Sequence, residues 1–199
     1  VLELARQQWC YEGRDIKLFD HRLVHLSTDE VYGPSRVQSH TDHRPSSPYA
    51  ASKAAQEDLV HAWNRTYGIP STIINSANMF GERQSQLAYV PRVIKAVLAG
   101  QALQVHAWHG QPGRRRYTYV RNTAQAMVEH LTASLAARLT ARVARVLLPG
   151  QHEIDNLQLA LRVAGLVGRP LKYELVDGPA VRPGYDPEYR PLGGGGEWA

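Results

Sequence analysis

The chain has 199 residues, 43% hydrophobic and 21% charged, which is the composition of an ordinary globular protein with one domain, or one domain and a small additional lobe. The single cysteine, Cys10, excludes an internal disulfide framework and favours a cytoplasmic location, while no apolar run approaches the roughly 20 residues of a membrane span and no signal-peptide pattern opens the chain. The net charge of +5 comes mainly from arginine, and it reflects either genome composition or attraction for an anionic ligand such as a diphosphate.

The first segment, Val1 to Gln8, has the pattern of the back half of an amphipathic helix. A dinucleotide-binding fold is expected to begin with a strand, a glycine-rich turn and a helix whose N-terminus receives the pyrophosphate. No such turn is found here, because the one glycine cluster, Gly193 to Gly196, lies near the other end without room for a following helix. We therefore expect the front of such a fold to be absent from this sequence.

A short apolar run with β-branched residues, 22–27, ends in a hydroxyl and two carboxylates, Thr28, Asp29 and Glu30. This pattern is typical of a buried parallel strand whose carboxyl end opens into a site. Neighbouring side chains on a regular strand face opposite ways, but that rule relaxes at the end of a strand. The two carboxylates are therefore candidates for an acid and a base that flank one substrate.

A helix is predicted to begin at Pro48, because Ser47 is a suitable N-cap and proline suits the first helical position. Tyr49 and Lys53 are four residues apart and share one face of this helix. A lysine one turn away favours the phenolate, and lowering a tyrosine pKa of about 10 by three units requires about 4 kcal/mol. Such a tyrosine takes the proton from a substrate hydroxyl, held by Thr28, while a hydride leaves the same carbon.

Simpler interpretations of this region exist. One is a surface turn beside a chance Tyr-x-x-x-Lys, and the strand and capped helix at this separation argue against it. His40 and His43 are three residues apart in the polar loop before the helix. Because no third ligand accompanies them, they are expected to be solvated, and no metal site is predicted.

The rest of the chain continues to alternate between strands and helices, which predicts an α/β fold. Expected helices are Tyr49 to Tyr67, Tyr89 to Ala99, Arg121 to Leu139, and Asn156 to the residue before Gly168. Expected strands are Ser71 to Ser76, Leu103 to Trp108, Val143 to Leu148, and Lys172 to Val176.

Segments 27–33 (Ser-Thr-Asp-Glu-Val-Tyr-Gly) and 45–53 (Pro-Ser-Ser-Pro-Tyr-Ala-Ala-Ser-Lys) resemble the extended short-chain dehydrogenase/reductases, and among them the nucleotide-sugar 4,6-dehydratases. The Thr-Asp-Glu triplet distinguishes these dehydratases from the related sugar epimerases, which usually have serine or threonine there without the acid pair. The resemblance implies NAD-dependent dehydration of a nucleoside-diphosphate hexose, with dTDP-glucose favoured, to a 4-keto-6-deoxy sugar.

The same resemblance implies a role for each residue of the motif. Thr28, Tyr49 and Lys53 would form the redox set at C4 of the sugar. Asp29 would protonate the departing C6 hydroxyl, and Glu30 would remove the C5 proton. The residues expected to contact NAD are Ser27, Tyr49 and Lys53.

On the substrate side, the resemblance carries over four residues: Asn78, Arg115, Arg182 and Tyr189. Asn78 lies in a turn that closes on the sugar, although a loop asparagine that satisfies backbone groups is an open alternative. The arginines would reach the nucleotide and its diphosphate. Arg116 stands where the family has an acid, and no nucleic-acid-binding motif accompanies this arginine run, so no nucleic-acid partner is expected.

The resemblance covers about residues 20 to 190 and implies a partial Rossmann-type parallel sheet with helices on both faces, plus a small C-terminal α/β substrate lobe. Residues 1–150 would form the truncated NAD(P)-binding domain, with substrate-lobe segments interleaved around 78–115. Residues 151–199 would form an incomplete C-terminal lobe. A homodimer is expected through the helix that carries Leu59 and Trp63.

Two other functions stay open at this point. An NAD-dependent nucleotide-sugar epimerase requires only the Thr28, Tyr49 and Lys53 set. A non-catalytic remnant of the family is favoured by the missing cofactor turn, which also predicts that this chain alone binds NAD⁺ weakly. Enzymatic activity of the chain by itself is therefore left undecided by the sequence.

Overall fold

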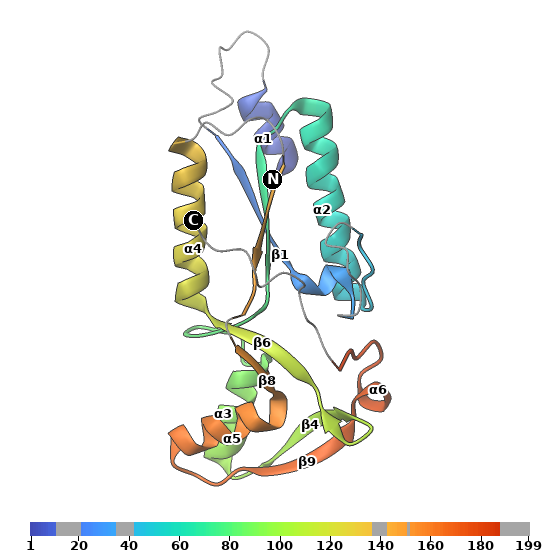
Figure 1. Cartoon of the computed structure of the whole chain (residues 1–199), viewed down its shortest axis with the longest axis vertical. Coiled ribbons are helices and arrows are strands. Elements are labelled where there is room, and N and C mark those ends of the chain that lie inside the picture. Colours follow the sequence, from blue (N-terminus) through green and yellow to red (C-terminus); the bar gives the residue numbers. More distant parts are fainter. Residues whose placement is uncertain (11–20, 35–41, 137–142, 151, 188–199) are drawn as a thin grey trace.

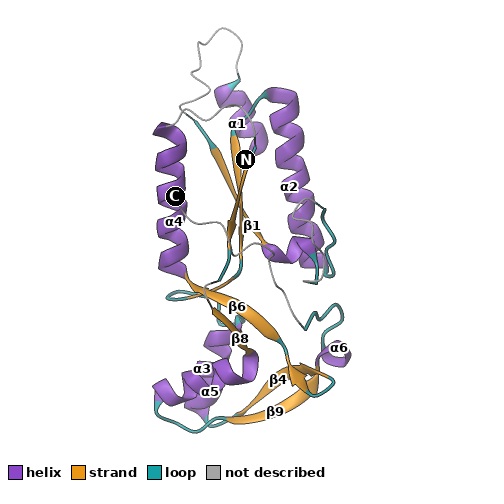
Figure 2. Cartoon of the chain, in the orientation of Figure 1, coloured by secondary structure: helices purple, strands orange, loops and turns teal. Residues whose placement is uncertain are grey.

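The computed structural model describes residues 1–10, 21–34, 42–136, 143–150 and 152–187. The molecule is elongated, with one three-stranded sheet in its upper half and two further three-stranded sheets below it (Figure 1). Helices and strands are mixed along the whole length of the chain (Figure 2). The fold is therefore of the predicted α/β class.

The upper sheet is parallel and consists of β1 (Leu23–Thr28), β2 (Ser71–Ser76) and β7 (Ala144–Leu148), in the order β1-β2-β7. The register pairs Thr28 with Ser76 and Ser76 with Leu148, so the three strands end at the same edge. Every residue of β2 is buried, as expected of a β-branched central strand. The carboxyl edge of such a sheet is where α/β proteins usually place a site.

Helices cover both sides of this sheet. Figure 1 shows α1 (Leu2–Trp9) and α2 (Pro48–Tyr67) on one side and α4 (Val120–Ala136) on the other. The prediction of helices on both faces is confirmed. Among the described helices, none combines the length and apolarity that crossing a membrane requires.

The ends of α2 follow the sequence signals. The Ser47 hydroxyl accepts a hydrogen bond from the Ala50 amide at 3.1 Å, and Pro48 occupies the first position. The helix ends at Gly68, whose φ of +69° is left-handed and costs glycine no Cβ clash. The N-cap fixes the start of α2 and therefore the positions of Tyr49 and Lys53 near that start.

The two lower sheets pack around short helices. One sheet contains β3 (Asn78–Phe80), β6 (Arg114–Tyr119) and β8 (His152–Asp155), and the other contains β4 (Ala102–Trp108), β5 (Gln111–Pro112) and β9 (Lys172–Asp177). The helices are α3 (Tyr89–Ala99), α5 (Asn156–Val167) and α6 (Gly178–Val181). A core of Val93, Val97, Leu103, Val105 and Ala160 joins α3 and α5 to β4.

Three features differ from the sequence predictions or lie beyond them. β1 was predicted to be a buried parallel strand, but it is an edge strand of the sheet within the described residues, and Leu26 is 39% exposed. Three short strands, β3, β5 and β8, were not predicted, since two to four residues show little periodicity. The division of the chain at residue 150 stays a prediction.

Candidate active site

The predicted acid pair lies on a single turn of 3-10 helix, η2 (Asp29–Tyr32), that directly follows β1. The Thr28 hydroxyl caps this turn by accepting a hydrogen bond from the Glu30 amide at 3.3 Å. Gly33 ends it with a φ of +71°, and a Cβ there would lie 2.2 Å from the Arg44 carbonyl oxygen. The turn, rather than strand alternation, therefore determines where Asp29 and Glu30 lie.

A cavity of about 300 Å³ lies between the ends of β1 and β2 and the start of α2; we call it the catalytic cavity. It is lined by Leu26, Ser27, Thr28, Glu30, Tyr49, Lys53, Ser76, Ala77, Asn78, Met79 and Gln84. The structure thus brings together six of the predicted site residues, from the end of β1, the turn that follows it, the start of α2 and the start of β3. Asp29 is not part of this lining, and its side chain is buried beside Thr28.

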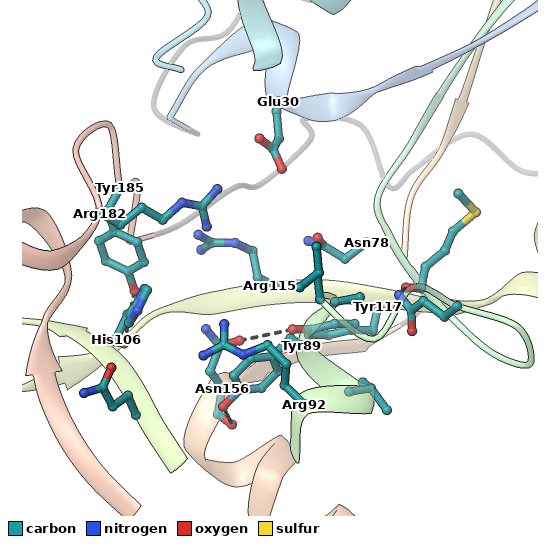
Figure 3. A pocket seen from close by; sticks show the side chains of 16 residues that line it. Glu30, Asn78, Tyr89, Arg92, His106, Arg115, Tyr117, Asn156, Arg182 and Tyr185 are labelled. Carbon is teal, nitrogen blue, oxygen red and sulfur yellow. Dashed lines mark hydrogen bonds between the residues drawn. The ribbon is translucent and has the colours of Figure 1, made fainter. Parts of the chain in front are cut away.

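A second cavity of about 270 Å³ adjoins the first, because both are lined by Glu30, Asn78, Met79 and Gln84. We call it the arginine pocket, after the three cations on its wall (Figure 3). Its other polar and aromatic lining residues are Tyr89, Arg92, Gln104, His106, Arg115, Tyr117, Asn156, Arg182 and Tyr185. Together the two cavities form one continuous site with a carboxylate, Glu30, at their junction.

The two carboxyl groups have different environments. Burial, together with the charge of Glu30, raises the pKa of Asp29 to about 7, although a hydrogen bond from the Thr28 hydroxyl opposes the shift. Burial also raises the pKa of Glu30, and the positive charges of Arg115 and Arg182 oppose that change. Asp29 is therefore suited to donate a proton near neutral pH, and Glu30 faces the cavity as the candidate base.

The expected lowering of the Tyr49 pKa by Lys53 is wrong for this structure. Burial and the charges of Glu30 and Asp29 raise the pKa of Tyr49, whose side chain is 56% exposed. The Lys53 ammonium donates a hydrogen bond to the Leu26 carbonyl oxygen at 2.7 Å and another to Gln56. Burial first, and the nearby carboxylates after it, thus set the direction of the Tyr49 pKa.

The three remaining substrate-side predictions have different outcomes. Arg115 is only 8% exposed, and its guanidinium donates to the carbonyl oxygens of Asp186 (2.5 Å) and Pro187 (3.0 Å). It therefore holds the C-terminal segment in place as well as lining the pocket. Arg182 is exposed and lines the arginine pocket. Tyr189 lies outside the described residues.

The sequence analysis missed several residues of the arginine pocket. Arg92 lies in the first turn of α3, where the helix dipole disfavours a cation. That unfavourable position is a sequence signal that could have pointed to a ligand-binding role. His106 gives no such signal, because it occupies an ordinary strand position. Tyr185 is 8% exposed and donates to the His106 carbonyl oxygen at 3.2 Å, a long-range contact that the sequence does not reveal.

Comparison with known proteins gives the family. The model of the NAD dependent epimerase/dehydratase family matches residues 1–139. The chain belongs to this family. The dTDP-glucose 4,6-dehydratase of Salmonella typhimurium is 34% identical over 207 residues, which cover 95% of this chain and 55% of that protein. The chain thus spans about half the length of the curated relatives it matches.

Solved structures agree on the fold. The dTDP-glucose 4,6-dehydratase of Bacillus anthracis in complex with NAD has a TM-score of 0.70 at 24% identity, covering 94% of this chain and 55% of that one. The UDP-glucose 4-epimerase of Thermus thermophilus in complex with NAD has a TM-score of 0.74 at 22% identity, covering 94% and 57%. Dehydratases and epimerases of the family thus share this Rossmann-type arrangement.

Proposed function

We propose that this chain carries the catalytic and substrate-binding residues of an NAD-dependent 4,6-dehydratase that acts on a nucleoside-diphosphate hexose. One observation carries the proposal: a single turn places Glu30 in a cavity that also holds Tyr49 and Lys53 and adjoins an arginine-lined pocket, with Asp29 buried beside Thr28 on the same turn. The names of the relatives favour dTDP-glucose as the substrate.

We assign the chemistry as the resemblance to the 4,6-dehydratases implies, and the position of Glu30 in the catalytic cavity supports it. Thr28 would hold the C4 hydroxyl, and Tyr49 would accept its proton as the carbon is oxidised, which requires Tyr49 to lose its own proton first and therefore a lower pKa than its present surroundings give. Glu30 then removes the C5 proton while Asp29 donates a proton to the departing C6 hydroxyl, so that one water leaves. Positioned acid and base groups each contribute on the order of 10² to 10⁴ in rate.

The donor set fits the nicotinamide end of NAD. Ser27, Tyr49 and Lys53 line the catalytic cavity, and hydroxyl and ammonium groups pair well with ribose hydroxyls. Bound NAD⁺ would supply the hydride chemistry: the hydride taken from C4 would return to C6, and the proton held by Glu30 would return to C5, so that the cofactor is regenerated. Within the described ranges no strand leads through a glycine-rich turn into a helix, so this part of the protein offers no such cradle for the pyrophosphate.

The arginine pocket suits the diphosphate. Arg182 and Arg92 are both exposed cations on its wall, and guanidinium groups pair with two phosphate oxygens at once. Tyr89, Tyr117 and Tyr185 add aromatic surface in the same pocket. We therefore place the nucleotide in the arginine pocket and the hexose in the catalytic cavity.

Mass spectrometry of dTDP-, UDP-, CDP- and GDP-linked hexoses, incubated with the chain and NAD⁺, tests the proposal. A product lighter by one water, formed from the dTDP sugar in preference to the others, is expected. Recovery of every sugar unchanged would contradict catalysis by this chain and favour the non-catalytic remnant.

An epimerase is the second candidate, because the Thr28, Tyr49 and Lys53 set serves both reactions and epimerases share the fold. In the same experiment an epimerase gives a product of unchanged mass with an altered sugar. The acid pair on one turn, with Glu30 in the cavity, favours the dehydratase, since epimerisation at C4 has no water to eliminate.

We also propose that the chain forms a homodimer through the exposed face of α2. Leu59 is 47% exposed on this helix, and burial of such apolar surface favours association. Analytical ultracentrifugation is expected to give the mass of two chains, and a monomer at all concentrations would contradict the proposal.

A further inference from the structure

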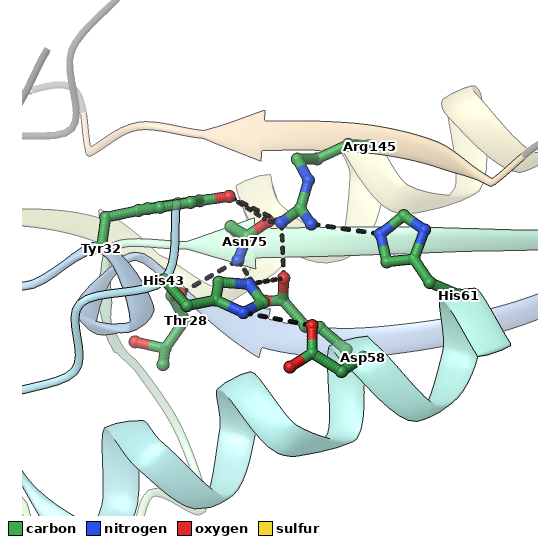
Figure 4. A network of polar contacts seen from close by, with 8 residues as sticks. Thr28, Tyr32, His43, Asp58, His61, Asn75 and Arg145 are labelled. Carbon is green, nitrogen blue, oxygen red and sulfur yellow. Dashed lines mark hydrogen bonds and ion pairs between the residues drawn. The ribbon is translucent and has the colours of Figure 1, made fainter. Parts of the chain in front are cut away.

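A polar network lies behind the catalytic turn (Figure 4), and its central side chains, Glu57, Asn75, Arg145 and Tyr32, line neither the catalytic cavity nor the arginine pocket. At its centre Glu57 of α2 is fully buried, and its carboxylate accepts hydrogen bonds from Asn75 at 2.7 Å and from Arg145 at 2.5 Å. Burial raises the pKa of Glu57, but hydrogen bonds and the charge of Arg145 outweigh burial and hold this pKa below its ordinary value. The network therefore contains an ion pair between a fully buried carboxylate and a partly exposed arginine, which joins α2 to β7.

Asn75 of β2 uses both ends of its amide in this network. Its nitrogen donates to Glu57 and, at 3.0 Å, to the carbonyl oxygen of Thr28. Its oxygen accepts from the Tyr32 hydroxyl at 3.3 Å and from Arg145 at 2.9 Å. The carboxylate on one side and the two donors on the other leave one orientation of the amide that satisfies every contact.

Arg145 joins the network from β7. It donates to the Tyr32 hydroxyl at 2.6 Å, and its guanidinium lies 5.8 Å from the centre of the Tyr32 ring. His43 also belongs here, with its ring 3.0 Å from Glu57 and 3.3 Å from Asp58. The expectation that His43 is a solvated loop residue is therefore wrong, because it closes the network from the loop before α2.

The contacts converge on the two ends of one turn. Asn75 holds the carbonyl of Thr28, the residue before η2, and Asn75 and Arg145 hold the hydroxyl of Tyr32, the last residue of η2. Asp29 and Glu30 lie between these two anchors. We infer that Glu57, Asn75, Arg145 and Tyr32 are positioning residues, which fix the turn so that its acid pair is held ready for elimination.

The inference rests on the proposed function for what the acid pair does, but the anchoring itself is testable without turnover. Tyr32→Phe removes one hydroxyl and keeps the ring, so it releases one end of the turn with little change in packing. Hydrogen–deuterium exchange of the amides of Glu30, Gly33 and Arg44, which bond within or onto the turn, is expected to become about fivefold faster, as for the loss of about 1 kcal/mol.

Tyr67→Phe is the matched control, because Tyr67 is 42% exposed at the far end of α2. It is expected to leave exchange in the turn unchanged. Arg145→Met is expected to accelerate exchange more than Tyr32→Phe, and Arg145→Lys, which retains the charge, to lie between them. Unchanged exchange in Tyr32→Phe, or an equal rise in α3 and α5, would overturn the inference.

A kinetic arm separates this inference from the proposed function. Failure of the wild-type chain to dehydrate any sugar counts against the proposed function alone, and the exchange experiment still decides the anchoring. Where the wild type turns over, Tyr32→Phe is expected to lower kcat about tenfold with KM unchanged, since small misplacements of catalytic groups cost up to about a hundredfold. A change in KM alone would overturn the positioning role.

Discussion

Asp29 and Glu30 are adjacent in sequence, yet the structure assigns them to different surroundings. Asp29 is 7% exposed and shielded by Thr28, whereas Glu30 lines both cavities and faces two arginines. Elimination of water needs a protonated group and an ionised group at the same pH. The unequal burial of the two carboxyls supplies that difference within one turn.

Burial of Asp29 predicts a pH-dependent stability. Its pKa rises from 3.8 in the unfolded chain to about 7 in the folded protein, so the carboxyl disfavours folding by about 4 kcal/mol once pH exceeds 7. Below about pH 4 the carboxyl is protonated in both the folded and the unfolded state, and it does not disfavour folding. The destabilisation develops as the pH rises from there toward 7. Asp29→Asn should therefore be more stable than wild type at about pH 8 and equal to it at about pH 3, as measured by urea unfolding.

The exposed carboxyl of Asp177 offers the control for this experiment. Asp177→Asn is expected to leave the difference in stability between the two pH values as in wild type. An Asp29→Asn variant whose stability follows that of wild type at both pH values would show that Asp29 is not held in a desolvated site.

Arg182 is predicted to contribute directly to nucleotide affinity. Arg182→Met removes a cation from the wall of the arginine pocket, and loss of charge-assisted hydrogen bonds worth about 1.5–3 kcal/mol weakens dTDP binding by about ten- to a hundredfold. Calorimetric titration measures the change. The control variant Arg162→Met, at an exposed position of α5, should bind dTDP with the affinity of wild type. If Arg182→Met also bound dTDP with the affinity of wild type, Arg182 would not be part of the nucleotide site.

At the residue scale the sequence predicted which groups meet but not how they interact. The placement of Tyr49 and Lys53 beside Thr28 followed from a strand end and a helix cap. The sequence did not predict the hydrogen bond from Lys53 to the Leu26 carbonyl oxygen or those from Arg115 to a segment about 70 residues away. Every residue has a backbone carbonyl, so the sequence does not indicate which carbonyl accepts.

At the element scale, the segment from α6 to Tyr185 depends on close packing against glycine. A Cβ on Gly178 would lie 2.4 Å from the buried ring of Tyr185. Gly178→Ala is therefore expected to destabilise the protein by about 1–3 kcal/mol, as other overpacked sites do. It should also weaken dTDP binding, because Arg182 lies on the displaced segment.

Gly165→Ala is the matched control for Gly178→Ala. Gly165 lies inside α5 with no atom within 4 Å of a Cβ, and alanine in a helix interior is favoured by up to about 1 kcal/mol. Thermal unfolding should show a higher Tm for Gly165→Ala and a lower Tm for Gly178→Ala. A Gly178→Ala variant with the Tm of wild type would argue against tight packing around Tyr185.

Element prediction succeeded where local signals were strong. The helix caps at Ser47 and Gly68 and the apolar run of β2 gave these elements nearly residue by residue. The 3-10 turn at Asp29–Tyr32 and the short strands β3 and β8 were not predicted, because tertiary contacts rather than periodicity define them. The buried network around Glu57 was missed for the same reason.

At the scale of the whole molecule, the chain crosses between the upper and lower halves more than once. It leaves the upper sheet after β2, builds β3 to β6 below, returns through α4 to β7, and then descends again to β8 (Figure 1). The candidate site lies where these crossings meet, which explains why its lining combines residues as distant as Glu30 and Arg182. The sequence predicted that Thr28, Tyr49 and Lys53 meet, but not that their cavity adjoins the pocket that Arg92, His106 and Tyr185 line.

The central claim is that the acid pair of the catalytic turn eliminates water from a nucleotide sugar. The most direct test is mass spectrometry of dTDP-glucose incubated with NAD⁺ and either the wild-type chain or Glu30→Gln. The account predicts a product lighter by one water from wild type and a rate lower by about 10² or more in Glu30→Gln. Equal turnover by both proteins, or a wild-type product of unchanged mass with an altered sugar, would contradict it.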